Sequence, residues 1–211
     1  MDMQETGQAE EPLTEEELVS ELAESGMARG GLYRLIGIFL ASSPNANMIE
    51  ALAQAIIDSA NIEDELMADG FKDMARYLET DLTNSTVLDL LVDYRLSVGK
   101  IEPFKEDDPL GTPQEQMGAL CESLCTLCSR MSETLQSNDY AEALKLANVQ
   151  SDLYKDRVVP LFTTFCDVLD AKAQTLFYRG TSKVARSFMQ EEQMYIEDTI
   201  AAIQELIDAQ E

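Results

Sequence analysis

The residues of this chain with the clearest chemical potential are three clustered cysteines, Cys121, Cys125 and Cys128. Their C-x3-C-x2-C spacing is the one by which radical enzymes that use S-adenosylmethionine hold an iron–sulfur cluster, with the thiolates on a loop. Here the surrounding segment, GALCESLCTLCSRM, has helical spacing and places the three thiols on one face, in line with Met117. Because buried cysteine behaves as a small apolar residue, the pattern favours core packing, and an iron–sulfur enzyme is the weaker alternative.

Histidine is absent from the sequence, which removes the commonest general base and the commonest metal ligand. Histidine-dependent catalytic triads and HExxH zinc sites are therefore excluded. The sequence also contains neither a GxGxxG nor a GxxxxGKS/T motif, so the usual phosphate-binding loops are missing. We therefore expect a protein that catalyses no reaction and that holds neither a cofactor nor a metal.

The chain is strongly acidic, with 40 aspartates and glutamates against 15 lysines and arginines and a formal net charge of -25. Such a field repels the phosphates of nucleic acids and anionic membrane surfaces, so neither is an expected partner. It attracts basic partners instead. Solubility alone, or an organism with an acidic proteome, would explain the charge equally well.

The N-terminal segment, MDMQETGQAEEPLTEEE, has no basic region followed by an apolar region, so it does not resemble a secretory signal. The longest apolar stretch, near residues 35–41, is much shorter than a membrane span. The cysteine spacing is not typical of a secreted disulfide framework. We therefore expect a cytoplasmic protein without stable membrane insertion.

Apolar residues recur at helical spacing along most of the chain, and no segment alternates with the period of a β-strand. Residues 1–12 are polar and acidic and are predicted to be disordered, which leaves one all-helical domain over residues 13–211. Thr14 and Glu17 form a capping-box pattern at its start. Gly26, Pro160 and the segment 177–180 are typical of helix ends or bends, so we predict an all-α, single-domain bundle of about eight to ten helices.

The helical pattern is interrupted between residues 99 and 113, in the segment GKIEPFKEDDPLGTP. Long loops in compact domains are often functional, although a plain linker between helical halves is an alternative. The loop could also act as a hinge, so we expect a monomer or a domain-swapped dimer. Its acidic run, Glu106 to Asp108, could hold a hard cation, but a solvated run of charges is the favoured interpretation.

Four segments match the motifs of a known family in their order and spacing. They are Tyr33–Pro44, Arg95–Gly99 with the following Pro103-Phe104, Pro113–Gly118, and Val158–Met189 with its Phe-Tyr and Phe-Met pairs. Together they resemble the TorD/DmsD/NarJ-type chaperones, which assist the maturation of molybdoenzymes. The resemblance covers about residues 27–195 and implies a TorD-like helical fold.

The resemblance implies a cytoplasmic chaperone that binds the twin-arginine leader or the apo form of a molybdopterin oxidoreductase catalytic subunit and assists cofactor loading before export. A leader offers two arginines and an apolar helix, so its recognition needs carboxylates beside an apolar surface. A helical adaptor for a different partner is the alternative. The residues expected to bind the peptide are Arg95, Leu96, Gly99, Glu102, Pro103, Phe104, Glu106, Asp107, Asp108, Glu115 and Gln116.

Overall fold

The computed structural model describes residues 13–79, 84–102 and 111–210, and every regular element in these ranges is a helix. The all-α prediction is therefore confirmed for this part of the chain, whereas residues 1–12, predicted to be disordered, lie outside it. The elements are α1 (Glu15–Ala41), α2 (Ala46–Asp58), the 3-10 turn η1 (Ser59–Asn61), α3 (Glu65–Glu79), α4 (Asn84–Leu96), the 3-10 turn η2 (Val98–Lys100), α5 (Pro113–Gln136), α6 (Tyr140–Leu153), the π-helical turn η3 (Tyr154–Val158), α7 (Val159–Lys172) and α8 (Leu176–Asp208).

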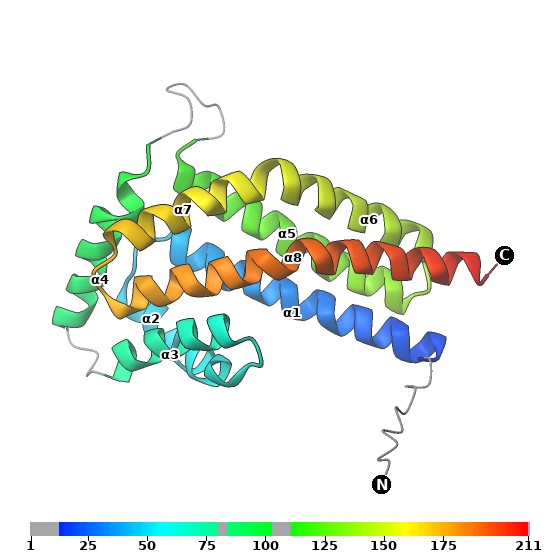
Figure 1. Ribbon diagram of the computed structural model, residues 1–211, viewed down its shortest axis with the longest axis horizontal. Coiled ribbons are helices and arrows are strands. Elements are labelled where there is room, and N and C mark those ends of the chain that lie inside the picture. The colour runs from blue at the N-terminus through cyan, green and yellow to red at the C-terminus, as the bar shows by residue number, and fades with distance from the viewer. Residues whose placement is uncertain (1–12, 80–83, 103–110, 211) are drawn as a thin grey trace, which may run out of the picture.

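Long helical segments form the body of the molecule, and the shorter helices α2, α3 and α4 gather at one end (Figure 1). Helix α1 packs along α5, while α8 packs along α3 and α6. The main core is rich in aromatic side chains, which include Tyr33, Phe39, Phe71, Phe162, Phe165 and Phe177. A smaller core at the other end joins the start of α1 to the ends of α5 and α8.

Helix α1 begins at the predicted capping box: Thr14 accepts a hydrogen bond from the Glu17 amide, and the Glu17 carboxylate accepts one from the Thr14 amide. The predicted end at Gly26 is wrong, because α1 continues to Ala41. Gly26, Gly30 and Gly37 of α1 serve its contact with α5 instead. A Cβ atom on Gly37 would lie 2.6 Å from the Cβ of Cys121, which no real pair of side chains tolerates.

The stretch from α6 to α7 is helical without interruption, although Pro160 lies within it. Proline lacks a backbone N–H, and its ring collides with the carbonyl group four residues earlier in a regular α-helix. The residues immediately before α7 form the π-helical turn η3, whose wider ring accommodates the proline. The Tyr154 hydroxyl of this turn donates to the Met189 carbonyl at 2.7 Å and so fastens the turn to α8.

Helix α8 likewise runs unbroken through residues 177–180, where a break was predicted. Gly180 packs against Gly70 of α3, and a Cβ atom on Gly70 would lie 2.7 Å from the Gly180 carbonyl oxygen. This glycine therefore permits two helices to approach and does not end one. With α6 through α7 counted as a single helix, the described residues form seven helices, fewer than the about eight to ten expected.

Candidate functional site

The predicted peptide-binding residues that the structure describes lie where α4 ends and α5 begins. Arg95 and Leu96 are exposed at the end of α4, Gly99 lies in η2, and Glu102 is exposed just after it. The other predicted residues in the loop lie outside the described residues: Pro103, Phe104, Glu106, Asp107 and Asp108. The Gln114 side chain donates to the Val98 carbonyl at 2.5 Å and holds the two helix ends together.

The two predicted residues on α5 both stabilise the start of that helix. The Glu115 carboxylate accepts hydrogen bonds from the amide and hydroxyl of Thr112, at 2.7 and 2.9 Å, in a second capping box. These bonds, to the backbone first, lower the pKa of Glu115. Gln116 is buried, and its side-chain amide donates to the Gly111 carbonyl at 2.9 Å. Both side chains therefore have local partners in the unbound protein.

Helix α4 has a buried inner face and, opposite it, an exposed apolar face. The inner face buries Leu90, Asp93, Tyr94 and Ser97 against the rest of the bundle. The outer face presents Leu88, Val92 and Leu96, which are 57%, 46% and 48% exposed. These three residues are spaced four apart, so they form one continuous stripe along the helix, which we call the α4 stripe. A surface helix usually turns a polar face outward, so this stripe has the character of a docking surface.

Helix α4 is held in this orientation by Asp93, whose side chain is buried. Its carboxylate accepts hydrogen bonds from the backbone N–H groups of Gln174 and Thr175, at 3.1 and 2.7 Å, and from the Thr175 hydroxyl at 2.7 Å. Thr175 is the N-cap of α8. The same carboxylate therefore fixes α4 to the start of α8, which leaves the α4 stripe facing outward on a rigid support.

Sequence reasoning missed the exposure of the α4 stripe. The four-residue spacing of Leu88, Val92 and Leu96 is present in the sequence. Val87 and Leu91, however, form a second apolar row with the same spacing beside it on the same helix. Periodicity shows that a helix is apolar and does not show which of two apolar faces the bundle will cover. Only the position of α4 at the end of the bundle separates them.

The cysteines lie where α5 contacts α1. Cys121 and Cys128 are buried against the α1 glycines, as the core-packing interpretation predicts, whereas Cys125 is half-buried. Burial raises the pKa of the Cys121 and Cys128 thiols to about 12, so both remain protonated at neutral pH. Iron–sulfur ligation needs deprotonated thiolates whose sulfur atoms converge on a space large enough for the cluster. Among the described residues, no group of three cysteine or carboxylate side chains could hold a metal ion.

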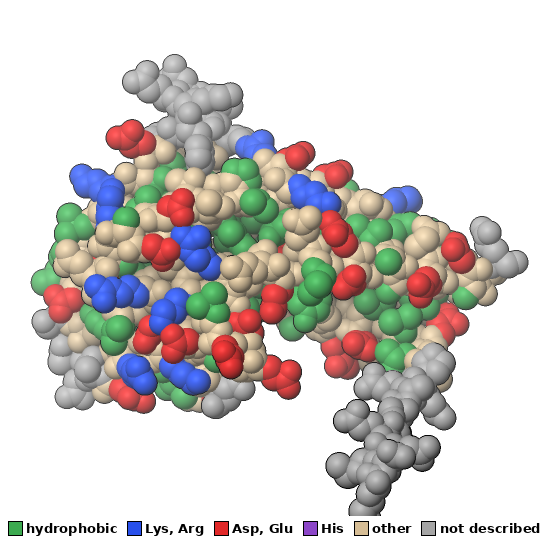
Figure 2. All heavy atoms as spheres, in the orientation of Figure 1, with side chains coloured by type: hydrophobic (Ala, Val, Ile, Leu, Met, Phe, Trp, Pro, Cys, Tyr) green, Lys and Arg blue, Asp and Glu red, His purple; other side chains and the backbone are tan. Residues whose placement is uncertain are grey.

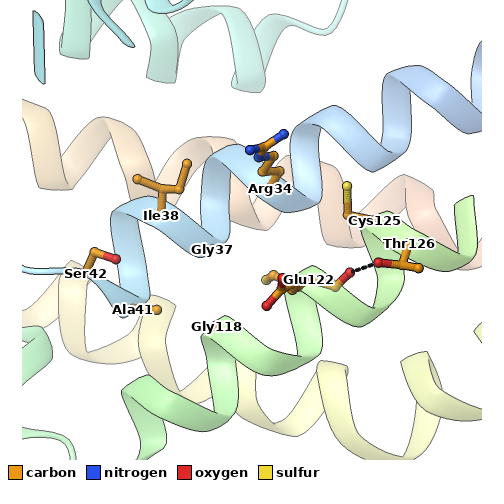
Figure 3. Close-up of a pocket in the computed structure, with 10 residues that line it drawn as sticks. Arg34, Gly37, Ile38, Ala41, Ser42, Gly118, Glu122, Cys125 and Thr126 are labelled. Atoms are coloured by element: carbon orange, nitrogen blue, oxygen red, sulfur yellow. Dashed lines mark hydrogen bonds between the residues drawn. The ribbon is translucent and has the colours of Figure 1, made fainter. Parts of the chain in front are cut away.

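A shallow groove of about 510 Å³ runs beside these cysteines, between α1 and α5 (Figure 3). Gly37 and Gly118 form part of its floor, and Arg34 and Glu122 lie along its edges (Figure 3). The dashed line in Figure 3 is the bond from the Thr126 hydroxyl to the Glu122 carbonyl, a contact within one helix. The groove follows from the small residues that bring α1 close to α5, and no buried polar group is directed into it.

A second groove, of about 550 Å³, lies between α1, α2, α3 and α8, and we call it the α1–α3–α8 groove. Most of its walls are apolar, and they include Leu32, Leu35, Ile62, Met67, Phe71 and Phe188. The carboxylates of Asp64 and Glu191 also line it, and Tyr195 is 45% exposed at its edge. Figure 2 shows the surface hollowed below α8, between α3 and the first half of α1, with acidic side chains on both sides.

Beneath this groove lies a buried ion pair between α1 and α8. Arg29 binds Glu192 through both carboxylate oxygens, at 2.9 and 2.6 Å, and the Tyr33 hydroxyl donates to the same carboxylate at 2.6 Å. Arg29 also donates to the Gln150 side chain of α6 at 3.2 Å. Burial alone lowers the pKa of Arg29, but the hydrogen bonds and charge of Glu192 outweigh it and raise the pKa. Arg29 therefore stays charged, with its Nε and Nη2 groups bound to Glu192 and Gln150.

No helix among the described residues combines the length and the apolar character of a membrane span. The chain matches no family model, and no curated protein or solved structure is significantly similar to it. The identification as a TorD/DmsD/NarJ-type chaperone therefore stays a prediction from the sequence motifs.

Proposed function

We propose that this protein is a chaperone that binds the apolar segment of a partner polypeptide on the α4 stripe and its adjoining surface. The observation that carries the proposal is that Leu88, Val92 and Leu96 are about half exposed on a helix whose opposite face is fully packed. The stripe spans residues 88 to 96, or about 12 Å of helix, which suits two turns of an amphipathic helix laid against it.

The finer proposal is that the partner is the catalytic subunit of a molybdopterin oxidoreductase, recognised in the cytoplasm through its twin-arginine leader or in its apo form. The support for this identity is the motif resemblance over about residues 27–195. The acidic composition is compatible with it, since a net charge of -25 would attract the leader's two arginines. Leu96 ends the stripe, Arg95 precedes it on α4, and Gly99 and Glu102 follow shortly after the helix, so these four residues would contact the leader together with the loop that follows.

A helical adaptor for an unrelated partner would use the same stripe, so the two functions differ in the sequence of the bound peptide. The test is a calorimetric titration of the protein with a twin-arginine leader peptide and with a scrambled peptide of the same composition. A chaperone of the proposed kind binds the leader and binds the scrambled peptide at least about tenfold more weakly, or about 1.4 kcal/mol. Equal affinity for both would favour the adaptor.

The stripe itself is tested by Val92→Ser with Val149→Ser as the matched control. Both valines are about half exposed on helices, at 46% and 51%, but Val149 lies on α6, away from the stripe. We expect Val92→Ser to weaken leader binding several-fold because an apolar contact is lost. Val149→Ser should leave it unchanged. If the two variants bind the leader equally well, the α4 stripe is not the binding surface.

A further inference from the structure

The α1–α3–α8 groove carries an inference beyond the α4 stripe. We propose that this groove is a second docking site, which takes an apolar side chain of a partner polypeptide and pairs a neighbouring arginine or lysine of that partner with Asp64 and Glu191. The inference rests on the proposed function only in taking the occupant to be a polypeptide. From residue 176, where α8 leaves α4, to residue 191 the helix advances about 22 Å, so the two surfaces are separate.

The apolar half of the proposal rests on the walls of the groove. Leu32 and Leu35 of α1 are only partly buried, and they line the groove together with Met67 and Phe71 of α3. The volume of about 550 Å³ exceeds what a single leucine or phenylalanine side chain fills. Residues of four helices, a 3-10 turn and the short connection 62–64 converge there, and several of them, such as Met67, Phe71 and Phe188, belong to the main core.

The charged half of the proposal rests on the two carboxylates. Asp64 caps the start of α3, where it accepts a hydrogen bond from the Met67 amide at 2.5 Å, and it also accepts one from the Ser187 hydroxyl. Glu191 stands one helical turn from Ser187 on α8 and faces Asp64. Burial, and then the charge of Asp64 and a hydrogen bond with it, raise the pKa of Glu191. Two carboxylates in contact repel each other unless a proton or a cation lies between them.

The protein offers these carboxylates no cation of its own in the part of the chain that the structure describes. Arg29, which lines the same groove, already pairs with the buried Glu192 carboxylate through its Nε and Nη2 groups. The two basic residues of α8 nearest in sequence to Ser187 also have partners. Lys183 is paired with Asp69 and Asp73. Arg186 is paired with Asp167 and Asp170. An arginine or lysine from the partner is therefore the complementary group.

The experiment uses the full chain and two synthetic amphipathic peptides of leucine, alanine and serine. They are identical except that one carries an arginine beside a leucine and the other carries citrulline there, which has nearly the same shape and no charge. Fluorescence anisotropy of the labelled peptides gives both dissociation constants. We expect the arginine peptide to bind roughly tenfold more tightly. In the double variant Asp64→Asn/Glu191→Gln this preference should fall below about twofold.

The double variant should fold, because the asparagine oxygen still accepts from the Met67 amide and the Ser187 hydroxyl, and glutamine keeps the shape of Glu191. The control for total charge is Glu205→Gln/Asp208→Asn, which neutralises two exposed carboxylates near the end of α8 and should keep the tenfold preference. Ala28→Trp tests the apolar half: Ala28 is exposed and lines the groove, so the indole should fill the space and weaken both peptides alike.

The inference is overturned if neither peptide binds, if arginine and citrulline bind equally well, or if the double variant keeps the preference. Val92→Ser on the α4 stripe should leave the preference for arginine intact. Loss of leader binding in Val92→Ser with an unchanged arginine preference supports two separate sites. Failure of the leader to bind at all, with the arginine preference still present, would refute the proposed function and leave this docking site standing.

Discussion

Replacing Arg29 by methionine should test how strongly the buried ion pair holds the bundle together. The substitution keeps much of the side-chain volume but leaves the Glu192 carboxylate, which is fully buried, without its cation. Tyr33 would remain as its hydrogen-bond donor. Removal of one partner of a buried ion pair typically costs about 3–5 kcal/mol, because the other charge stays out of water.

This cost is large but measurable. Native proteins unfold with a free energy of roughly 5–15 kcal/mol, so Arg29→Met should still fold under native conditions. The double variant Arg29→Met/Glu192→Met removes both charges and should be more stable than Arg29→Met alone, since no charge is then buried. Tyr33→Phe should cost about 1.5–3 kcal/mol, the range for a hydrogen bond to a charged group.

The assay is urea unfolding followed by circular dichroism, with Lys155→Met as the matched control. Lys155 pairs with Glu197 at 3.1 Å, a distance similar to that in the buried pair, but both side chains are about half exposed. Water and salt screen such a pair, so the control should lose far less stability than Arg29→Met. If Arg29→Met and Lys155→Met have the same urea midpoint, the reasoning about burial is refuted.

Two other stability predictions follow from packing and from titration. Gly37→Ala should destabilise the protein by about 1–3 kcal/mol, because the new Cβ would lie 2.6 Å from the Cβ of Cys121. Gly31→Ala should instead stabilise α1 by about 0.5–1 kcal/mol, because no atom lies within 4 Å of the new Cβ. Equal urea midpoints for the two variants would contradict this. Burial raises the pKa of the Cys121, Cys128 and Cys166 thiols from 9.0 to about 12. A raised folded-state pKa favours the neutral thiol, so this contribution to stability is complete below pH 9.0 and is lost as the pH rises toward 12. Urea midpoints measured between about pH 8 and pH 10.5 should therefore fall, and a triple Cys→Ala variant should show a smaller decline.

The candidate surfaces show where sequence reasoning succeeded and where it stopped. Leu96 was predicted to bind the peptide, and it is exposed, but Leu88 and Val92, which are exposed on the same side of α4, were not among the predicted binding residues. Glu115 and Gln116 were expected to meet a peptide, and each has a local hydrogen-bond partner in the free protein. The predicted residues from 103 to 108 lie outside the described part of the chain.

The features that the sequence determined by itself are local. The helical class follows from apolar spacing within a few turns, and the start of α1 follows from Thr14 and Glu17, which are three residues apart. The core role of Cys121 and Cys128 follows from their position on one helical face. Each of these depends on interactions within a single helix, which neighbouring residues encode directly.

The tertiary structure decided everything that depends on residues distant in sequence. Glycine is typical of a helix end, but Gly26 lies in the interior of α1, where it contacts α5. Arg29 pairs with Glu192, which is 163 residues away in the sequence. Ser187, whose hydroxyl binds Asp64 and so joins it to α8, is 123 residues from Asp64. Such pairings depend on how whole helices pack. Apolar periodicity predicts that a helix has a buried face, but it does not predict which helix packs against that face. The α1–α3–α8 groove and its two carboxylates therefore became visible only in the folded chain.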